Sequence, residues 1–233
     1  RKATFESLNI SAGQHILDLG CGGGHLLKDL ALSVGVNGQV VGLDPSDKQI
    51  EAAQEYCKGL DNVSFNLDSA VKLSFEDNAF DAVASIQVLE YIKDVDSALA
   101  EISRVIKPGG RLATVSVLWD HWRFHGPDPV LNDRMHEAFK AHCFHQMLPL
   151  EMPKKLEDHG FIGAQCTPMG FLNNSLHHNS FAYLASTLLT HFAEGQGISK
   201  EDTERWRKEL DESEREGRFG FVSVPVLTTA IAK

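Results

Sequence analysis

A glycine-rich segment, Asp18-Leu19-Gly20-Cys21-Gly22-Gly23-Gly24, most constrains what this chain of 233 residues can fold into. The apolar run before it, residues 15–20, predicts a buried strand, and residues 25–34 after it have the spacing of an amphipathic helix. Glycine allows a sharp turn and the close approach of a ligand, and the start of a helix offers free N–H groups. The segment therefore predicts a strand, a ligand-binding turn and a helix.

Short apolar runs and helical patterns alternate over the first 118 residues. Such alternation predicts a parallel sheet with helices on both faces. The turn Lys107-Pro108-Gly109-Gly110 is expected to stop the helix before it, because proline and glycine do not continue a helix. The expected strands are 15–20, 39–44, 62–68, 80–86 and 111–118, and the expected helices are 25–34, 47–57 and 95–106.

The alternation of short apolar runs and helical patterns ends after residue 118. Residues 119–150 are rich in tryptophan, histidine and turn formers, and residues 171–220 interrupt the alternation a second time. Within the later part, Ser199 and Asp202 form the pattern of a capping box, Trp206 is expected to anchor a charged helix, and Pro225 suggests an edge or a bulge in the closing strand. The expected helices are 152–160, 181–192 and 199–217, and the expected strands are 161–169 and 221–232.

Composition excludes several classes of protein. The formal charge of −10 argues against a nucleic-acid-binding surface, and no apolar run approaches the length of a membrane span. With no signal peptide, we expect a cytoplasmic protein without membrane or nucleic-acid partners. The chain begins with Arg1 rather than Met, so an N-terminal segment of the native protein is expected to be missing. The four cysteines lie far apart and predict reduced thiols rather than disulfides or a metal site.

Polar residues follow the expected strands. Asp44 ends the second strand, 24 residues after Gly20, where a carboxylate can accept two hydrogen bonds from a ribose diol. Asp68 ends the third strand and can meet an adenine amino group, and Gln87 follows the fourth. Each residue also has a simpler interpretation: the glycines could form only a tight turn, Asp44 could cap a helix, and Gln87 could be a solvated loop residue.

Together these features resemble the class I S-adenosylmethionine-dependent methyltransferases. Asp18, Gly20, Gly22 and Gly24 match their acid-x-G-x-G-x-G motif, and the segments 80–92 and 107–110 match their fourth-strand motif and the turn before strand five. Within that family the chain is similar to the ubiquinone- and menaquinone-biosynthesis-like group, strongly over residues 13–118. The resemblance implies a single α/β domain with a Rossmann-like, doubly wound, seven-stranded sheet whose last strand is antiparallel. It also implies S-adenosylmethionine as cofactor, bound by Asp18, Gly20, Gly22, Gly24, Asp44, Pro45, Asp68, Ser69 and Gln87.

The two interruptions, 119–150 and 171–220, are longer than the minimal family plan requires. Insertions at a functional edge often cover a substrate, and these segments hold most of the 11 histidines of the chain. We therefore expect helical caps that bind a small-molecule acceptor, in which an oxygen, nitrogen or carbon atom receives the methyl group. Trp119, Trp122, His145 and Asn173 are the expected acceptor-binding residues. His121, His125 and His177 are the candidate general bases, because imidazole titrates near neutral pH.

Three other functions stay open from the sequence. An NAD-dependent oxidoreductase would have a third glycine where this chain has His25. A catalytically silent subunit would use the fold only to support a partner. An arsenite- or thiol-directed methyltransferase would need Cys57, Cys143 and Cys166 to converge. The oligomeric state is not predicted.

Overall fold

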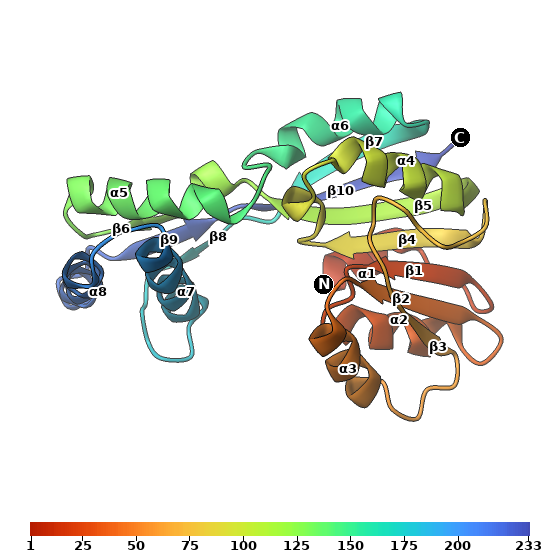
Figure 1. Cartoon of the computed structure of the whole chain (residues 1–233), viewed down its shortest axis with the longest axis horizontal. Helices are drawn as coiled ribbons and strands as arrows, with labels where there is room; N and C mark the ends of the chain where they lie inside the picture. Colours follow the sequence, from red (N-terminus) through yellow and green to blue (C-terminus); the bar gives the residue numbers. More distant parts are fainter. The chain divides into compact units, whose positions relative to one another are not determined.

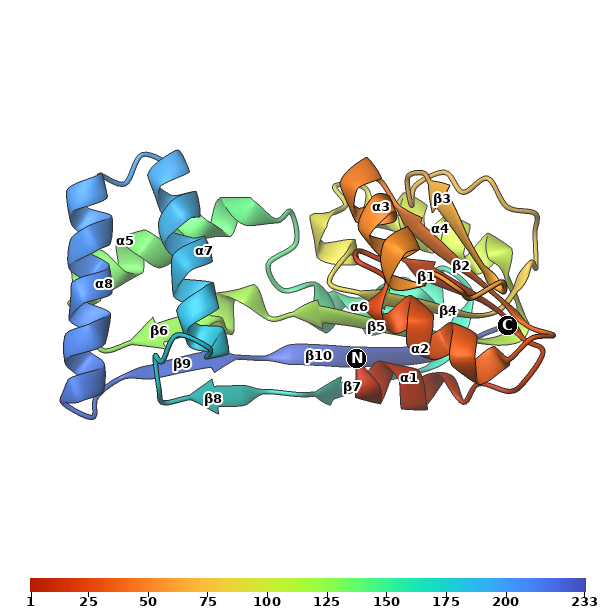
Figure 2. The same cartoon turned by 90° about the horizontal axis from the view of Figure 1, so that it is seen from below.

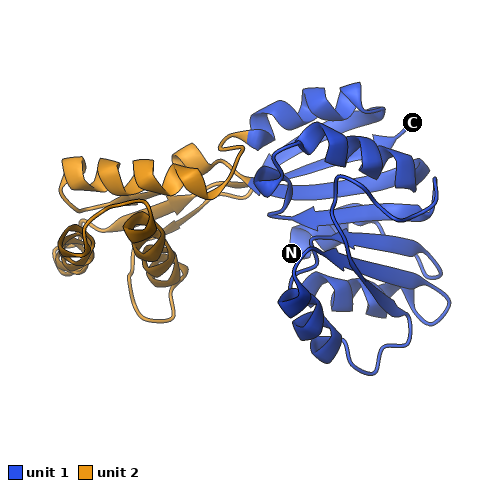
Figure 3. Ribbon diagram, viewed as in Figure 1, with its two compact units in different colours: residues 1–116, 148–167, 226–233 blue, residues 117–147, 168–225 orange.

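The computed structural model describes all residues from Arg1 to Lys233. The chain divides into two compact units (Figure 3). Unit 1 comprises residues 1–116, 148–167 and 226–233, and unit 2 comprises residues 117–147 and 168–225. No helix of the structure has both the length and the apolar character that a membrane crossing requires.

Unit 1 is built on a seven-stranded sheet, whose strands appear in Figure 1 in the order β3-β2-β1-β4-β5-β10-β7. The pairs β1–β2, β1–β4, β2–β3 and β4–β5 are parallel. Backbone hydrogen bonds from Lys233 to Gly160 and from Met169 to Pro225 show that β10 runs antiparallel to β7, which confirms the antiparallel last strand. The strands are β1 (His15–Leu19), β2 (Gln39–Asp44), β3 (Val63–Leu67), β4 (Phe80–Ile86), β5 (Ile106–Val117), β7 (Phe161–Pro168) and β10 (Pro225–Ala232).

Helices cover both faces of this sheet. On one face, buried leucines, isoleucines and valines of α4 and α6 pack against Leu17, Val83 and Leu112 of the strands. On the other face, α2 and α3 contact each other and β2, and α1 contacts α2 and β4. The helices of unit 1 are α1 (Lys2–Leu8), α2 (His25–Val34), α3 (Asp47–Tyr56), η1 (Leu89–Tyr91), α4 (Val95–Val105) and α6 (Leu148–Asp158).

Unit 2 contains a three-stranded antiparallel sheet in the order β6-β9-β8. Figure 2 shows α5, α7 and α8 on the same side of this sheet. Its core is rich in aromatic residues, including Trp122, Phe124, Trp206 and Phe221, which are each at most 4% exposed. The elements are η2 (Trp119–His121), β6 (Arg123–His125), α5 (Pro129–Phe139), η3 (Lys140–His142), β8 (Phe171–Asn173), α7 (Phe181–Gly195), α8 (Lys200–Arg215) and β9 (Gly220–Ser223).

The structure differs from the sequence expectations at several places, of which three concern long segments of the chain. Residues 107–110 do not precede strand five but form a bulge within it, because Phe80 pairs with Ile106 while Ala82 pairs with Arg111. The expected strand 221–232 is two strands, β9 in one sheet and β10 in the other, separated at Val224. The turn-rich stretch after Gly126 leads into α5, which the sequence analysis did not predict; Asp128 caps this helix by accepting a hydrogen bond from the Leu131 N–H.

Candidate functional site

The glycine-rich turn lies at the carboxyl ends of the central parallel strands of unit 1. It begins where β1 ends, and the N–H groups of Gly20 and Cys21 donate to the Leu43 carbonyl of β2 at 2.7 and 2.9 Å. These bonds hold the start of the turn against the end of the neighbouring strand. Ligands of open α/β sheets bind outside the carboxyl ends of the strands, so this edge is the candidate site.

Asp44 holds the middle of the turn through a hydrogen bond. Its Oδ2 atom accepts a hydrogen bond from the Gly22 N–H at 3.0 Å, and its Oδ1 atom accepts one from the Ser46 N–H at 3.0 Å. The residue is 8% exposed. A carboxylate offers about four lone-pair positions, so each oxygen can accept one further hydrogen bond from a ligand.

Two glycines of the turn are required by their surroundings. Gly20 has φ +72°, and a Cβ atom there would lie 2.1 Å from Cγ2 of Val88. Gly24 has φ +81°, and a Cβ atom there would lie 3.1 Å from the backbone Cα of Ala53. Gly22 differs, because nothing lies closer than 3.9 Å to its Cβ position. The turn is therefore packed against other residues at Gly20 and Gly24 and is open at Gly22, where a ligand can approach.

Asp18 is buried beneath the turn. It is 2% exposed, it accepts a hydrogen bond from the Leu27 N–H, and its Oδ2 atom has no hydrogen-bond partner. The pKa of Asp18 is raised to about 7, chiefly by burial and to a smaller extent by the nearby charge of Asp44, while the hydrogen bond from the Leu27 N–H lowers it. A buried oxygen without a donor is costly, so an N–H donor or a cation of a ligand would stabilise this carboxylate.

The other predicted cofactor residues follow neighbouring strands at the same edge. Asp68 is half-buried directly after β3, and its Oδ1 atom accepts from the Ser69 N–H at 2.7 Å. Gln87 is exposed after β4 with φ +54°, and its N–H donates to the Val115 carbonyl of β5. Pro45 is exposed between Asp44 and α3. Parallel pairing of β3, β2, β1 and β4 brings the ends of these strands to one edge.

The thiols of Cys21, within the turn, and of Cys57, after α3, are both buried and therefore poorly placed to react. Cys21 is 8% exposed and Cys57 is 3% exposed. Burial raises the pKa of the Cys21 thiol to about 12 and raises that of Cys57 as well. Cys57 follows α3, beside β2 and β3, whereas Cys166 lies on β7 at the opposite edge of the sheet. The convergence of Cys57 with Cys166 that an arsenite- or thiol-directed enzyme would require is therefore not present.

The predicted acceptor residues and bases lie in unit 2. The rings of Trp119 and Trp122 are 5.8 Å apart, Trp122 being buried and Trp119 half-buried. Asn173 accepts a hydrogen bond from the Ala182 N–H with its Oδ1 atom, next to the start of α7. His145 is half-buried in the segment that follows η3. The three candidate bases are exposed on separate segments, His121 in η2, His125 on β6 and His177 before α7, and no contact joins them.

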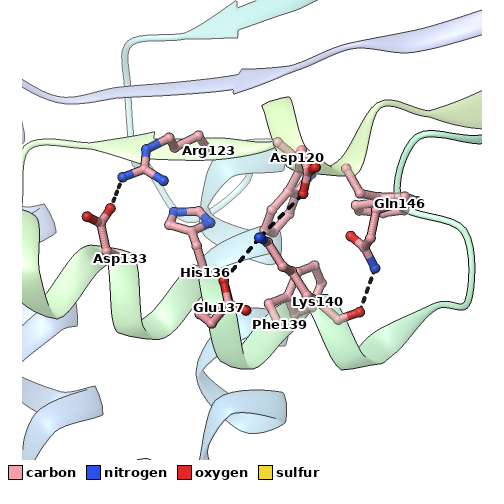
Figure 4. A pocket seen from close by; sticks show the side chains of 10 residues that line it. Asp120, Arg123, Asp133, His136, Glu137, Phe139, Lys140 and Gln146 are labelled. Atoms are coloured by element: carbon pink, nitrogen blue, oxygen red, sulfur yellow. Dashed lines mark hydrogen bonds and ion pairs between the residues drawn. The ribbon is translucent and has the colours of Figure 1, made fainter. Parts of the chain in front are cut away.

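A group of polar side chains on α5 and at the start of η3 was not predicted from the sequence. Asp133, His136, Glu137 and Lys140 recur at the spacing of one helix face and line a pocket of about 330 Å³ in unit 2 (Figure 4). His136 is half-buried: its Nε2 atom accepts a hydrogen bond from the Phe124 N–H at 3.1 Å, and burial lowers its pKa to about 3. The helical spacing would have revealed this group if α5 had been predicted as a helix.

Comparison with known proteins places the chain in a family. Residues 10–180 match the family described as "Methyltransferase domain". An O-methyltransferase, resE, from Aspergillus sclerotiorum is 39% identical over 137 residues, 58% of this chain and 50% of that protein. A demethylmenaquinone methyltransferase from Staphylococcus haemolyticus is 36% identical over 112 residues, 48% of this chain and 47% of that protein. The chain thus spans about half the length of the curated relatives it matches.

Solved structures share the fold. The YcgJ protein from Bacillus subtilis is similar with a TM-score of 0.68 at 19% identity, covering 100% of this chain and 97% of that one. Phosphoethanolamine N-methyltransferase 2 from Haemonchus contortus, in complex with phosphomonomethylethanolamine and S-adenosylhomocysteine, is similar with a TM-score of 0.62 at 18% identity, covering 99% of this chain and 52% of that one. With the family match over most of its length, the chain belongs to the methyltransferase domain family.

Proposed function

We propose that this protein transfers a methyl group from S-adenosylmethionine to a small organic acceptor. The observation that carries the proposal is the glycine turn between β1 and α2, tied to Asp44 of β2 at the carboxyl edge of the sheet. Family membership supports the reaction class. The solved relative from Haemonchus contortus with S-adenosylhomocysteine bound supports the identity of the cofactor.

Three features of the chain fit this cofactor. The free acceptor positions on the two oxygens of Asp44 suit the two hydroxyl groups of a ribose. The open middle of the turn at Gly22 leaves room for a ligand against the backbone. The Oδ2 atom of Asp18 lacks a donor, and a ligand ammonium group could supply one. In our proposal Asp68 and Ser69 bind the adenine of the cofactor, and Pro45 and Gln87 border the same site.

When bound, S-adenosylmethionine supplies an electrophilic methyl group on a good leaving group. The work left to the chain is to hold the acceptor in line with that methyl group and to exclude water. A general base is needed only for an acceptor whose nucleophile must lose a proton, and His121, His125 and His177 remain the proposed bases for that case. We propose that unit 2, with Trp119, Trp122, His145 and Asn173, recognises the acceptor.

Neither an NAD-dependent oxidoreductase nor a catalytically silent subunit is supported by a feature of its own. At His25, where a dinucleotide turn would have its third glycine, the imidazole packs edge-on against Tyr56 at 4.5 Å. A silent subunit would not need the turn open at Gly22 or acceptor positions free on Asp44.

Calorimetric titration of the protein with S-adenosylmethionine, S-adenosylhomocysteine and NAD tests the proposal. We expect micromolar or tighter binding of the first two and none of NAD. A methyl-transfer assay with labelled S-adenosylmethionine, run over phenols, amines and carboxylic acids, then tests turnover. Absence of binding by both sulfur nucleotides would reject the cofactor, and binding without any turnover would favour the silent subunit.

A further inference from the structure

A pocket of about 330 Å³ lies wholly within unit 2, between η2, β6 and α5. We call it the α5 pocket and define it by the lining residues Trp119, Trp122, Arg123, His136, Phe139 and Lys140. Its size is near the lower end of the range of about 300–1,000 Å³ for small-molecule sites. One or two fused rings would fill it. No part of the proposed cofactor site contributes to it.

His136 gives the α5 pocket a donor that the chain does not use. Because the Nε2 atom of His136 accepts from the Phe124 N–H, that nitrogen carries no proton. Burial and the adjacent Arg123 charge keep the pKa of His136 at about 3, so the ring is neutral near pH 7 and its proton sits on Nδ1. No hydrogen bond of the structure engages this Nδ1–H group. A ligand with an acceptor oxygen would satisfy it.

Two cations flank the His136 ring with donors to spare (Figure 4). Arg123 forms an ion pair with Asp133 through one of its terminal nitrogens, which leaves most of its five N–H groups available. The Lys140 Nζ atom lies 3.0 Å from Glu137 and 3.7 Å from Asp120, and an ammonium has three donors. Arginine, neutral histidine and lysine therefore present N–H groups to one space, which is the donor set of an oxyanion site.

Aromatic side chains form the apolar wall of the α5 pocket. The Trp122 and Phe139 rings stack with centroids 4.8 Å apart, and the Trp119 ring lies edge-on to Phe139 at 6.0 Å. Such a wall favours a flat, unsaturated body over an aliphatic chain or a hydrated ion. We propose that the α5 pocket binds a planar aromatic carboxylate, with the carboxylate on Arg123, His136 and Lys140 and the ring against Trp122 and Phe139.

An organic cation is the competing ligand class, because three carboxylates line the pocket against two cations. The structure disfavours it on two grounds. Asp120, Asp133 and Glu137 are already engaged by Lys140 and Arg123. In addition, the remaining nitrogen of His136 is a donor and offers no acceptor to an ammonium group.

The test is calorimetric titration of the full chain with 1-naphthoate, 1-naphthamide, 1-naphthylmethylamine and inorganic phosphate. We expect naphthoate to bind, and to bind at least about tenfold more tightly than the amide, because charge-assisted hydrogen bonds are roughly twice as strong as neutral ones. Tightest binding by the amine, equal binding of acid and amide, or no binding of the acid would overturn the proposal. Binding of phosphate as tight as that of naphthoate would overturn the aromatic part.

Variants assign the site. Arg123→Met and Lys140→Met should each weaken naphthoate binding about fivefold or more, and His136→Phe should do the same while thermal unfolding confirms that it folds. The matched control is Arg134→Met, because Arg134 lies on α5 near the pocket residues in the chain and, like Arg123, pairs with a carboxylate, Asp202, at 3.0 Å, but does not line the pocket. Equal effects of Arg123→Met and Arg134→Met would reject the site. Binding of S-adenosylhomocysteine, measured on the same samples, reports separately on the proposed function.

Discussion

The Gly22 N–H donates to Oδ2 of Asp44 at 3.0 Å, which joins the turn after β1 to the end of β2. The same carboxylate accepts from the Ser46 N–H with its other oxygen. One side chain thus shapes the glycine turn and the entry to α3, and it keeps acceptor positions for a ligand. Removing it should therefore affect both local stability and cofactor binding.

Asp44→Ala is expected to weaken binding of S-adenosylhomocysteine by about 1–3 kcal/mol, the usual effect of losing charge-assisted hydrogen bonds. Calorimetry on the wild type and the variant measures this loss. Asp47→Ala is the control, because Asp47 is an exposed acid in the first turn of α3 and has the same charge. An affinity unchanged in Asp44→Ala, or lowered equally in both variants, would show that Asp44 does not bind the cofactor.

Gly20→Ala should destabilise the protein by about 2–4 kcal/mol, because it combines an unfavourable positive φ with overpacking. The added Cβ atom would lie 2.1 Å from Cγ2 of Val88. Gly13→Ala isolates the backbone contribution, since Gly13 has φ +84° with nothing within 4 Å of its Cβ position, and it should cost about 1 kcal/mol. Urea denaturation compares the two free energies of unfolding.

The Val88 contact can be separated by a double-mutant cycle. In a Val88→Ala background the two Cγ atoms are absent, so Gly20→Ala should cost at least about 1 kcal/mol less than in the wild type. If the cost of Gly20→Ala is the same in both backgrounds, the contact between Val88 and Gly20 does not explain why glycine is required there.

The part of unit 1 that contains the glycine turn could be predicted from the sequence because its signals are local. The strand His15–Leu19, the turn and the helix His25–Val34 are consecutive, and each has its own local signal: a short apolar run, a cluster of glycines and an amphipathic helical spacing. The position of Asp44 at the carboxyl end of β2 could be predicted for the same reason, since it ends a continuous apolar run. What the sequence could not show is the contact of Val88 with Gly20, because residues 68 positions apart meet only through sheet pairing of β1 with β4.

Unit 2 was harder to predict because its signals are ambiguous or non-local. The stretch Gly126-Pro127-Asp128-Pro129 suggests a turn, yet Asp128 is the N-cap of α5 and Pro129 is at its first turn. Strands β6 and β8 have three residues each, too few for a period of two to be visible, and they exist through pairing with β9. The α5 pocket is lined by residues of α5 and β6, so it could not be predicted without these two elements.

Asp18 predicts an unusual dependence of stability on pH. Because burial raises the pKa of Asp18 from 3.8 to about 7 in the folded state, the folded protein holds a proton that the unfolded chain releases between these values. The free energy of unfolding should therefore fall as pH rises from about 4 to about 7, by up to about 4 kcal/mol from this group. Asp18→Asn removes the titration and should be more stable than the wild type at pH 7.5.

Urea denaturation of the ligand-free wild type and Asp18→Asn at pH 5.0 and pH 7.5 measures this difference. Titrating groups other than Asp18 contribute equally to both proteins and cancel in the comparison. A difference in unfolding free energy that is the same at both pH values would show that Asp18 is ionised in the folded protein throughout.

Trp206 connects α8 to α5 through one buried hydrogen bond. Its Nε1–H group donates to Oδ1 of Asn132 at 2.9 Å, and Trp206 and Asn132 are 0% and 4% exposed. Trp206→Phe keeps an aromatic ring against Phe124 but leaves Oδ1 of Asn132 buried without a donor, so it should cost about 1–3 kcal/mol of stability. Val130→Ala, at an α5 position that is 70% exposed, should change stability by no more than about 0.5 kcal/mol. Thermal and urea unfolding measure both variants, and a Trp206→Phe protein as stable as the Val130→Ala control would show that the aromatic packing of unit 2, rather than this hydrogen bond, holds α8 in place.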